Sequence, residues 1–166
     1  DLNVSGTVNV ESVKEQAEIV WELTEGVHWN RCRLDLNTGQ VRITRIDTGI
    51  DPEEEIELAT AQTSIQGPGT FTFQFANVDD RLSLWLDGDL VDFGEASSYE
   101  QSVLHGMLPN ASDYSPAGIG LQGASATVSD LVIFRDIYYR GSDRIFENAE
   151  KLLSNAGEWS RAYRNR

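Results

Sequence analysis

Alternating apolar and polar residues run through most of the chain and predict β-strands. The clearest example is the stretch 76–93, in which three leucines at every second position (Leu82, Leu84 and Leu86) alternate with Arg81, Ser83, Trp85 and Asp87. The pair Asp87-Gly88 then follows, and both residue types tolerate a positive φ, which a tight hairpin turn requires. Just upstream, phenylalanines alternate with polar residues in the same way (Phe71, Phe73 and Phe75). This part of the chain is therefore predicted to be a meander of three successive strands.

The same period of two recurs along the rest of the chain. It predicts further strands at 2–10, 17–23, 27–36, 41–43, 56–60, 116–122 and 126–139. Gly6 interrupts the first of them, which predicts a bulge there. Turns are predicted at Asn37–Gln40 and Gly67–Gly69. Many short strands with regular turns and few helical signals favour an all-β, two-sheet antiparallel jelly-roll sandwich.

The pattern changes near the C-terminus. Ser142 can cap a helix whose apolar residues form one stripe (Ile145, Phe146, Ala149, Leu152 and Leu153). We therefore expect a sandwich at 1–139 and a C-terminal helix with a linker at 140–166. The last predicted strand has apolar residues in both phases, so we expect it to be covered on both sides or to lie against the terminal helix.

Composition narrows the class of protein. The chain has 166 residues and a net charge of −14, which argues against sequence-independent binding to nucleic acid, because phosphate contacts need a basic surface. No apolar run reaches the length of a membrane span. The first residues lack the features of a secretion signal, so we expect any targeting element to be removed or to lie outside this sequence. Cys32, the only cysteine, shares a strand phase with Leu34 and is predicted to be a buried structural thiol.

Residues able to carry catalysis are scarce. The two histidines, His28 and His105, have no marked serine near them, and one cysteine with two separated histidines makes a zinc site improbable. Glycan hydrolysis needs two carboxyl groups at a fixed separation. The run 55–60 ends on a threonine where the second acid would be needed, and a hairpin turn splits the acids at 87, 89 and 92. No catalytic residue is predicted.

Binding is better supported by the residue pattern. Trp29, Arg31 and Arg33 lie in the phase opposite Cys32, and Trp85 lies in the phase opposite the leucines. If these surfaces adjoin, aromatic planes and guanidinium groups could hold a sugar or a peptide. The alternative is that both tryptophans are covered by a loop or by the terminal helix, which is the more common fate of large aromatic residues.

No cofactor is predicted. Calcium could be held by aspartates near the central strands, but their spacing matches no dedicated calcium loop, and surface acids are the favoured interpretation (Asp79, Asp80, Asp87 and Asp89).

Two resemblances follow from particular phrases of the sequence. The segment DRLSLWLDGDLV after a strand ending FQFANV resembles the concanavalin-like and laminin-G-like jelly-roll superfamily, over about residues 1–139. Three phrases together, CRLDLNTGQ, FANVDDRLSLWLDG and SPAGIGLQGASATVSDLVIFRDIYY, resemble the extra domain inserted in signal-peptidase-I-like proteins of certain bacteria. The serine–lysine pair and the G-D-N motif of such serine endopeptidases have no match here, so no catalytic residue is carried over.

These resemblances imply three functional hypotheses. The first is a non-catalytic accessory domain of a signal-peptidase-I-like protein, soluble itself but extracytoplasmic and membrane-associated through its parent, that binds a protein or peptide segment. The second is a carbohydrate-binding module that uses Trp29, Arg31 and Trp85 to hold a glycan. A glycan hydrolase is the least favoured of the three.

Overall fold

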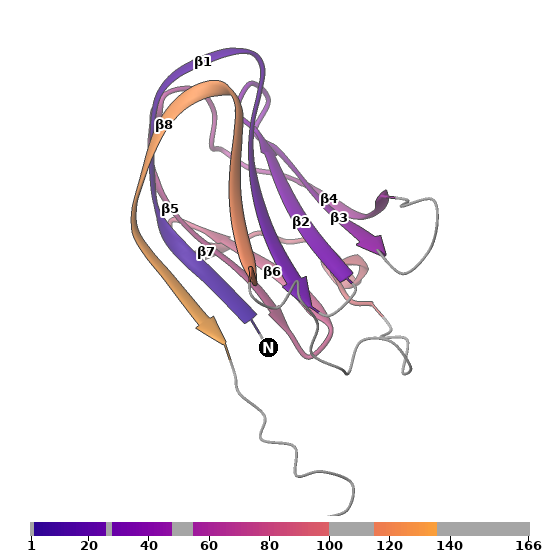
Figure 1. Cartoon of the computed structure of the whole chain (residues 1–166). Helices are drawn as coiled ribbons and strands as arrows, with labels where there is room; N and C mark the ends of the chain where they lie inside the picture. Colours follow the sequence, from indigo (N-terminus) through magenta and orange to yellow (C-terminus); the bar gives the residue numbers. More distant parts are fainter. Residues whose placement is uncertain (1, 26–27, 48–54, 100–114, 136–166) are drawn as a thin grey trace, which may run out of the picture. The chain divides into compact units, whose positions relative to one another are not determined.

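The computed structural model describes residues 2–25, 28–47, 55–99 and 115–135, which belong to one compact unit, Asp1–Asp136. Nearly all of these residues form antiparallel strands (Figure 1). The strands are β1 (Leu2–Glu25), β2 (His28–Asp35), β3 (Gln40–Asp47), β4 (Glu55–Gln62), β5 (Gly69–Val78), β6 (Arg81–Leu86), β7 (Asp89–Leu90) and β8 (Ala117–Arg135). One 3-10 turn, η1 (Gly94–Ser97), lies among the described residues, and no described helix has the length and apolarity needed to cross a membrane.

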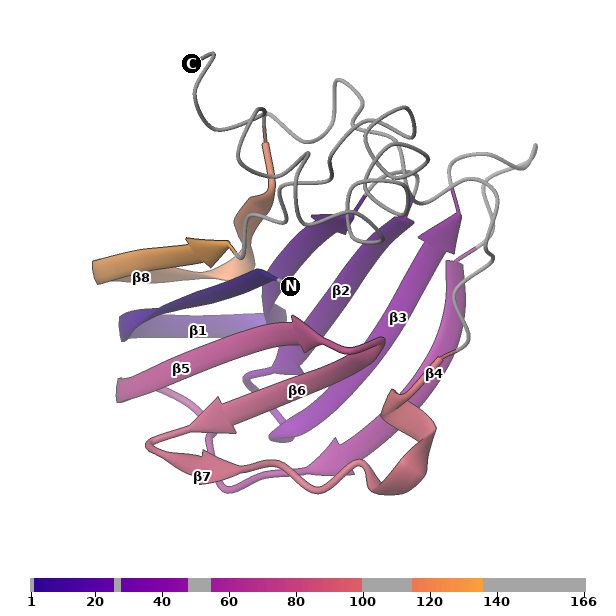
Figure 2. The same cartoon turned by 90° about the horizontal axis from the view of Figure 1, so that it is seen from below.

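Two long strands pass through both layers of the fold. The first part of β1, residues 2–10, pairs with β5, and its last part, residues 18–25, pairs with β2. β8 runs beside β1 along both parts. One layer therefore has the order β7-β6-β5-β1-β8 and the other β4-β3-β2-β1-β8 (Figures 1 and 2). This arrangement confirms the predicted all-β antiparallel sandwich.

The core lies between the two layers and is built from the residues that the alternation marked as apolar. Trp21 of β1 is fully buried, and its ring stacks on Phe73 of β5 with 5.1 Å between centroids and meets Phe71 edge-on at 6.5 Å. The leucines of β6 and the phenylalanines of β5 are buried, as predicted. Cys32 is also fully buried, and loss of solvent raises the pKa of its thiol well above the ordinary value, which confirms a structural thiol.

The strands predicted at 2–10 and 17–23 are one strand, β1, and those predicted at 116–122 and 126–139 join into β8. The sequence pattern breaks where these two strands bend together from one layer into the other. Register shifts lie between Val13 and Glu18, and positive φ angles occur at Gln16 and Gly123. The bend exposes polar residues and ends the alternation, so the pattern alone divides each strand in two.

The predicted bulge at Gly6 is present, but its extra residue is on β8. Ser5 pairs with Val132 and Thr7 with Ser129, so that Asp130 and Leu131 together oppose Gly6. A side chain at Gly6 would bring its Cβ within 3.0 Å of the Ser129 carbonyl oxygen. Glycine is needed here because the bulged strand lies so close.

The remaining predictions concern the turns, the cover over the last strand and the C-terminal helix. The turns at Gly39 (φ 75°) and at Asp87-Gly88 (φ 51° and 86°) are confirmed. Cover on both sides is not found at Leu131–Phe134, whose side chains are 42–64% exposed, since β8 pairs only with β1 among the described strands. The alternative, contact with the terminal helix, lies outside the described residues. The predicted helix and the division at 139/140 lie outside the described residues, as do most of the acidic loop and of the long loop before β8.

The hairpin at Gly88 provides a test of backbone conformation alone. Gly88→Ala is expected to lower the free energy of unfolding by about 1 kcal/mol, because an alanine at φ 86° is strained. Gly69→Ala is the matched control, since neither glycine has an atom within 4 Å of an added Cβ and only Gly88 has a positive φ. Urea unfolding measures both. Equal losses in the two variants would contradict the assignment of strain to the turn.

Candidate functional site

The four residues predicted to bind a ligand lie on two different faces of the sandwich. Trp29, Arg31 and Arg33 point outward from β2, in one layer, and Trp85 points outward from β6, in the other. The layers pack together through their inner faces, so these two outer faces are directed away from each other. The structure therefore does not form the combined surface that we considered. Both tryptophans are partly exposed, which corrects the expectation that they would be covered.

On the β2 face, the arginines are held by glutamates of neighbouring strands. Arg31 donates from Nε to Glu22 at 2.6 Å, and its guanidinium lies 5.5 Å from the centroid of the Trp29 ring. Arg33 pairs with Glu18 at 3.1 Å and with Glu55 at 3.2 Å. These contacts engage the guanidinium groups within the protein, so the two arginines act first as sheet-stabilising groups.

The electrostatics of Glu55 show the strength of this pairing. Partial burial raises the pKa of the Glu55 carboxyl, but a hydrogen bond from the Thr44 hydroxyl (2.5 Å), a hydrogen bond from Arg33 and the charges of Arg33 and Arg31 outweigh it. The pKa of Glu55 therefore lies below its ordinary value of 4.5. The β2 face is an organised ion-pair network.

The outer face of β6, which carries Trp85, has a depression lined by polar side chains. A depression of about 310 Å³ opens beside the Trp85 indole. Ser5, Gln74 and Trp85 form one row across β1, β5 and β6, and Thr7 and Thr72 form the next. The lining residues are Ser5, Gly6, Thr7, Thr72, Phe73, Gln74, Trp85, Gly88 and Asp130. Among these nine residues the hydrogen-bonding side chains are three hydroxyls, one amide, the Trp85 indole N–H and a single carboxylate, in a chain of net charge −14.

Two local features shape this depression, which we call the Trp85 depression. The β8 bulge places Asp130 at one side, and Gly6, which has no side chain, lies next to it. At the other side the Asp87 carboxylate accepts hydrogen bonds from the Thr72 backbone N–H (2.8 Å) and hydroxyl (3.3 Å), which ties the hairpin to β5. The walls are therefore set by backbone pairing and do not need a ligand to form.

Sequence reasoning identified Trp85 but missed its polar neighbours. Ser5, Thr7, Thr72 and Gln74 are the outward residues of strands whose inward residues were recognised as core. The alternation predicts that these residues face outward. It does not predict the order of strands, which places β1 beside β5.

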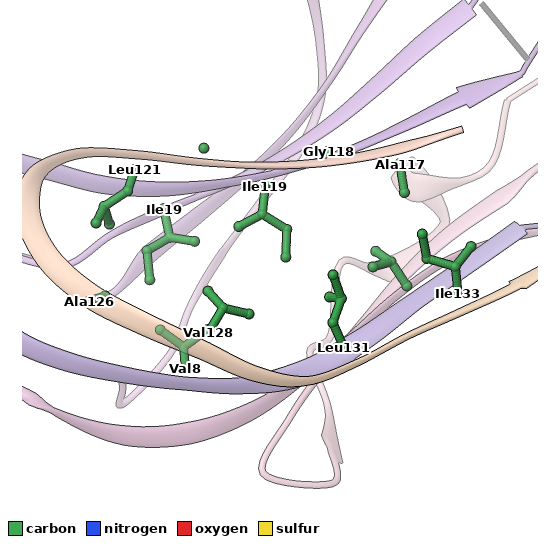
Figure 3. Close-up of a pocket in the computed structure, with 12 residues that line it drawn as sticks. Val8, Ile19, Ala117, Gly118, Ile119, Leu121, Ala126, Val128, Leu131 and Ile133 are labelled. Atoms are coloured by element: carbon green, nitrogen blue, oxygen red, sulfur yellow. The ribbon is translucent and has the colours of Figure 1, made fainter. Parts of the chain in front are cut away.

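A second hollow is apolar. It has a volume of about 410 Å³ and lies between the two arms of β8 and β1, where the labelled side chains gather in Figure 3. Its lining includes Ile19, Ile119, Leu121, Val128, Leu131 and Ile133. It is the edge of the sandwich interior, and none of its described lining residues has a polar side chain that would orient a small ligand.

The described residues give little support to catalysis or metal binding. His28 is only 2% exposed, and His105 lies outside the described residues. Asp87 is the first residue of the two-residue turn and Asp89 begins β7 after it, which confirms that the hairpin turn splits the acidic run. The aspartates considered for calcium lie at opposite ends of β6, with Asp79 and Asp80 before it and Asp87 and Asp89 after it, and no group of three or more potential metal ligands occurs in the described part.

Comparison with protein families and with characterised proteins gives no match. Among solved structures, the chain is similar to carbohydrate-binding module CBM66 from Bacillus subtilis, at 13% identity, over 80% of this chain and 74% of that one, with a TM-score of 0.55. It is more distantly similar to sheep galectin-11 in a complex with glycerol, at 13% identity, over 80% and 88% of the chains, with a TM-score of 0.47. At these identities the first likeness establishes the β-sandwich fold alone, and neither likeness supports the link to signal peptidases.

The ion-pair network predicts a pH-dependent contribution to stability. Because the folded pKa of Glu55 lies below the unfolded one, its pairing stabilises the fold at pH values above about 4.5 and is lost as the pH falls through the folded pKa. Glu55→Gln is expected to lower the free energy of unfolding by up to about 1 kcal/mol near neutral pH, with a difference that shrinks in acid.

Urea unfolding at a series of pH values measures this difference. Glu57→Gln is the control on the same strand, because its contact with Arg42 is 4.0 Å long and both side chains are about half exposed. A Glu55→Gln deficit that stays constant down to acid pH would contradict the role of the ion pairs.

Proposed function

We propose that this chain is a non-catalytic carbohydrate-binding domain and that the Trp85 depression holds the sugar. The observation that carries the proposal is the combination of a partly exposed indole with hydroxyl and amide side chains on neighbouring strands. A sugar ring presents C–H groups on its face, which pack on an aromatic plane, and hydroxyls at its edge, which need hydrogen-bond partners. The row Ser5–Gln74–Trp85 supplies both kinds of contact.

Charge favours a neutral glycan. The chain carries a net charge of −14, and among the described residues that line the depression only Asp130 is charged. An anionic glycan would be repelled by the acidic chain and would meet no cation among these described lining residues. A neutral sugar pays no such cost, and the Asp130 carboxylate can accept a hydrogen bond from one of its hydroxyls.

The fold is compatible with this role. The solved structure with a TM-score of 0.55 is named as a carbohydrate-binding module, which supports a sugar ligand as one that this kind of sandwich can carry. The β2 face is the weaker candidate, because Arg31 and Arg33 are already paired with glutamates and Arg31 lies over the Trp29 ring.

The role as an accessory domain of a signal-peptidase-I-like protein stays a prediction from the resemblance, together with the extracytoplasmic location and the protein or peptide partner. It does not exclude glycan binding. The sequence that flanks this chain in its gene tests it, because transmembrane segments with a serine–lysine core would be required there.

Substitution of the two tryptophans tests the sugar site. Trp85→Ala is expected to weaken glycan binding at least about tenfold, since losing a stacking contact of about 1.4 kcal/mol corresponds to that factor. Trp29→Ala is the matched control, because that tryptophan is also partly exposed but lies on the opposite face. A glycan array of neutral and anionic sugars identifies the ligand, and calorimetry with that sugar gives the affinities.

Circular dichroism of both variants verifies that they fold. The proposal fails if the folded wild-type chain binds no glycan on the array, or if Trp29→Ala abolishes binding while Trp85→Ala retains it. Preferential binding of anionic glycans would overturn the inference drawn from charge.

A further inference from the structure

The outer edge of β8 has the properties of a strand that pairs with another strand. Among the described residues, β8, which is 19 residues long, pairs with β1 alone. An unpaired edge presents a row of backbone N–H and C=O groups, and proteins usually protect such edges with charges, proline or very short strands. β8 contains no proline or lysine.

The other two edges of the sandwich carry such protection. β4 exposes Glu55 and Glu57, and β7 is only two residues long and includes Asp89. In β8 the only charged residues are Asp130 and Arg135, whose formal charges cancel. In a chain of net charge −14, a contact between two copies through this edge adds no net negative charge, whereas a contact through β4 or β7 would bring further carboxylates together.

The end of β8 is apolar on both of its faces. Leu131 and Ile133 face the apolar hollow and are 52% and 46% exposed. Val132 pairs with Ser5 and Phe134 with Asn3 on the outer face, where they are 42% and 64% exposed. An edge strand with exposed apolar side chains on both faces is typical of a strand that is covered when another strand pairs with its free edge.

We propose that two copies of this chain pair through β8, antiparallel, with Ile133 opposite Ile133 of the second copy. The two copies are related by a two-fold axis perpendicular to the layer, which keeps each side chain on its own face. Directly opposed residues of an antiparallel pair also point to the same face, so one residue must lie opposite its own copy at the axis. In this register Val132 lies opposite Phe134 of the second copy, and Leu131 lies along the stem of Arg135. Every exposed apolar side chain of residues 131–134 then has a cross-strand neighbour.

This pairing also accounts for the apolar hollow. Leu131 and Ile133 belong both to the hollow and to the paired segment. The second copy therefore lies beside the open edge of the sandwich and reduces the access of water to it.

The pairing has a consequence that rests on the proposed function. The layer that contains Trp85 becomes continuous across the two copies, and the axis keeps both Trp85 depressions on one face. Seven strand spacings separate the two β6 strands, roughly 34 Å at about 4.8 Å each. Two sites on one face can bind a glycan-coated surface with avidity.

Charged substitutions of Ile133, the residue at the two-fold axis, test the proposed contact between the two copies. Sedimentation equilibrium of the wild-type chain is expected to give twice the monomer mass of 18.5 kDa. Ile133→Lys and Ile133→Glu place like charges opposite each other, so each variant alone is expected to dissociate at least tenfold more readily. An equal mixture of the two is expected to recover the dimer, because Lys then lies opposite Glu.

Matched controls establish the register. Val128→Lys changes a valine that is 40% exposed on the same strand but outside the paired segment, and it is expected to leave the dimer intact. Mixing Val132→Lys with Val132→Glu is expected not to restore the dimer, since Val132 does not oppose itself. Recovery in that mixture, and not in the Ile133 mixture, would overturn the register.

Several results would overturn the pairing itself. The first is a wild-type monomer at concentrations up to about 1 mM. The second is a dimer that both Ile133 variants leave unchanged. The third is a monomer in which the amides of 131–135 that point away from β1 resist hydrogen exchange, because another segment then covers the edge. The failure of the sugar site is distinguishable. Trp85→Ala would remain a dimer without binding glycan, whereas Ile133→Lys would bind a soluble sugar normally and lose at least about tenfold in binding to a glycan-coated surface.

Discussion

The packing of Trp21 against Phe73 joins the two layers of this sandwich, and both layers are anchored in one strand. Because β1 contributes its first part to one layer and its last part to the other, its registers with β5 and β2 are coupled through the bend between them. The stacked ring of Phe73 at 5.1 Å fixes how the two parts face each other. A slip of one residue between β1 and β2 would put Trp21 out of phase with the core residues of β2, and a slip between β1 and β5 would do the same to Phe73, which makes the arrangement specific.

The same long strands explain where function is placed. β8 follows β1 through both layers and must bulge where it passes Gly6, and that bulge shapes one side of the Trp85 depression. Among the described strands β8 also ends both layers, and the side chains of Leu131–Phe134 at its end are partly exposed. The proposed sugar site and the proposed pairing edge therefore arise from one feature, the course of β8 beside β1. The pairing would extend the sheet without altering the depression, because Trp85 is three strands away from β8.

The two outer faces show why residue type alone is a poor guide to a binding site. Trp29, Arg31 and Arg33 have the chemistry of a ligand-binding surface, but neighbouring glutamates engage both guanidinium groups. The polar residues beside Trp85 match no motif in the sequence, yet the pairing of β1 with β5 brings them together (Ser5, Thr7, Thr72 and Gln74). The neighbouring strand therefore determines whether a polar side chain is paired within the protein or lies beside a depression that a ligand could enter.

The sequence by itself determined the class of the fold, most of the core and the principal turns. Period-two alternation reports which residues face inward, as at Phe71–Phe75 and Leu82–Leu86, and a positive φ demands particular residues, as at Asp87-Gly88. It did not reveal that β1 and β8 are continuous, because a bend exposes polar residues and ends the alternation. Only the tertiary structure decided which strands are neighbours. That order separates Trp29 from Trp85, places Gln74 and Ser5 beside Trp85, and leaves Leu131–Phe134 on an edge, because these relations depend on pairing between residues far apart in the chain.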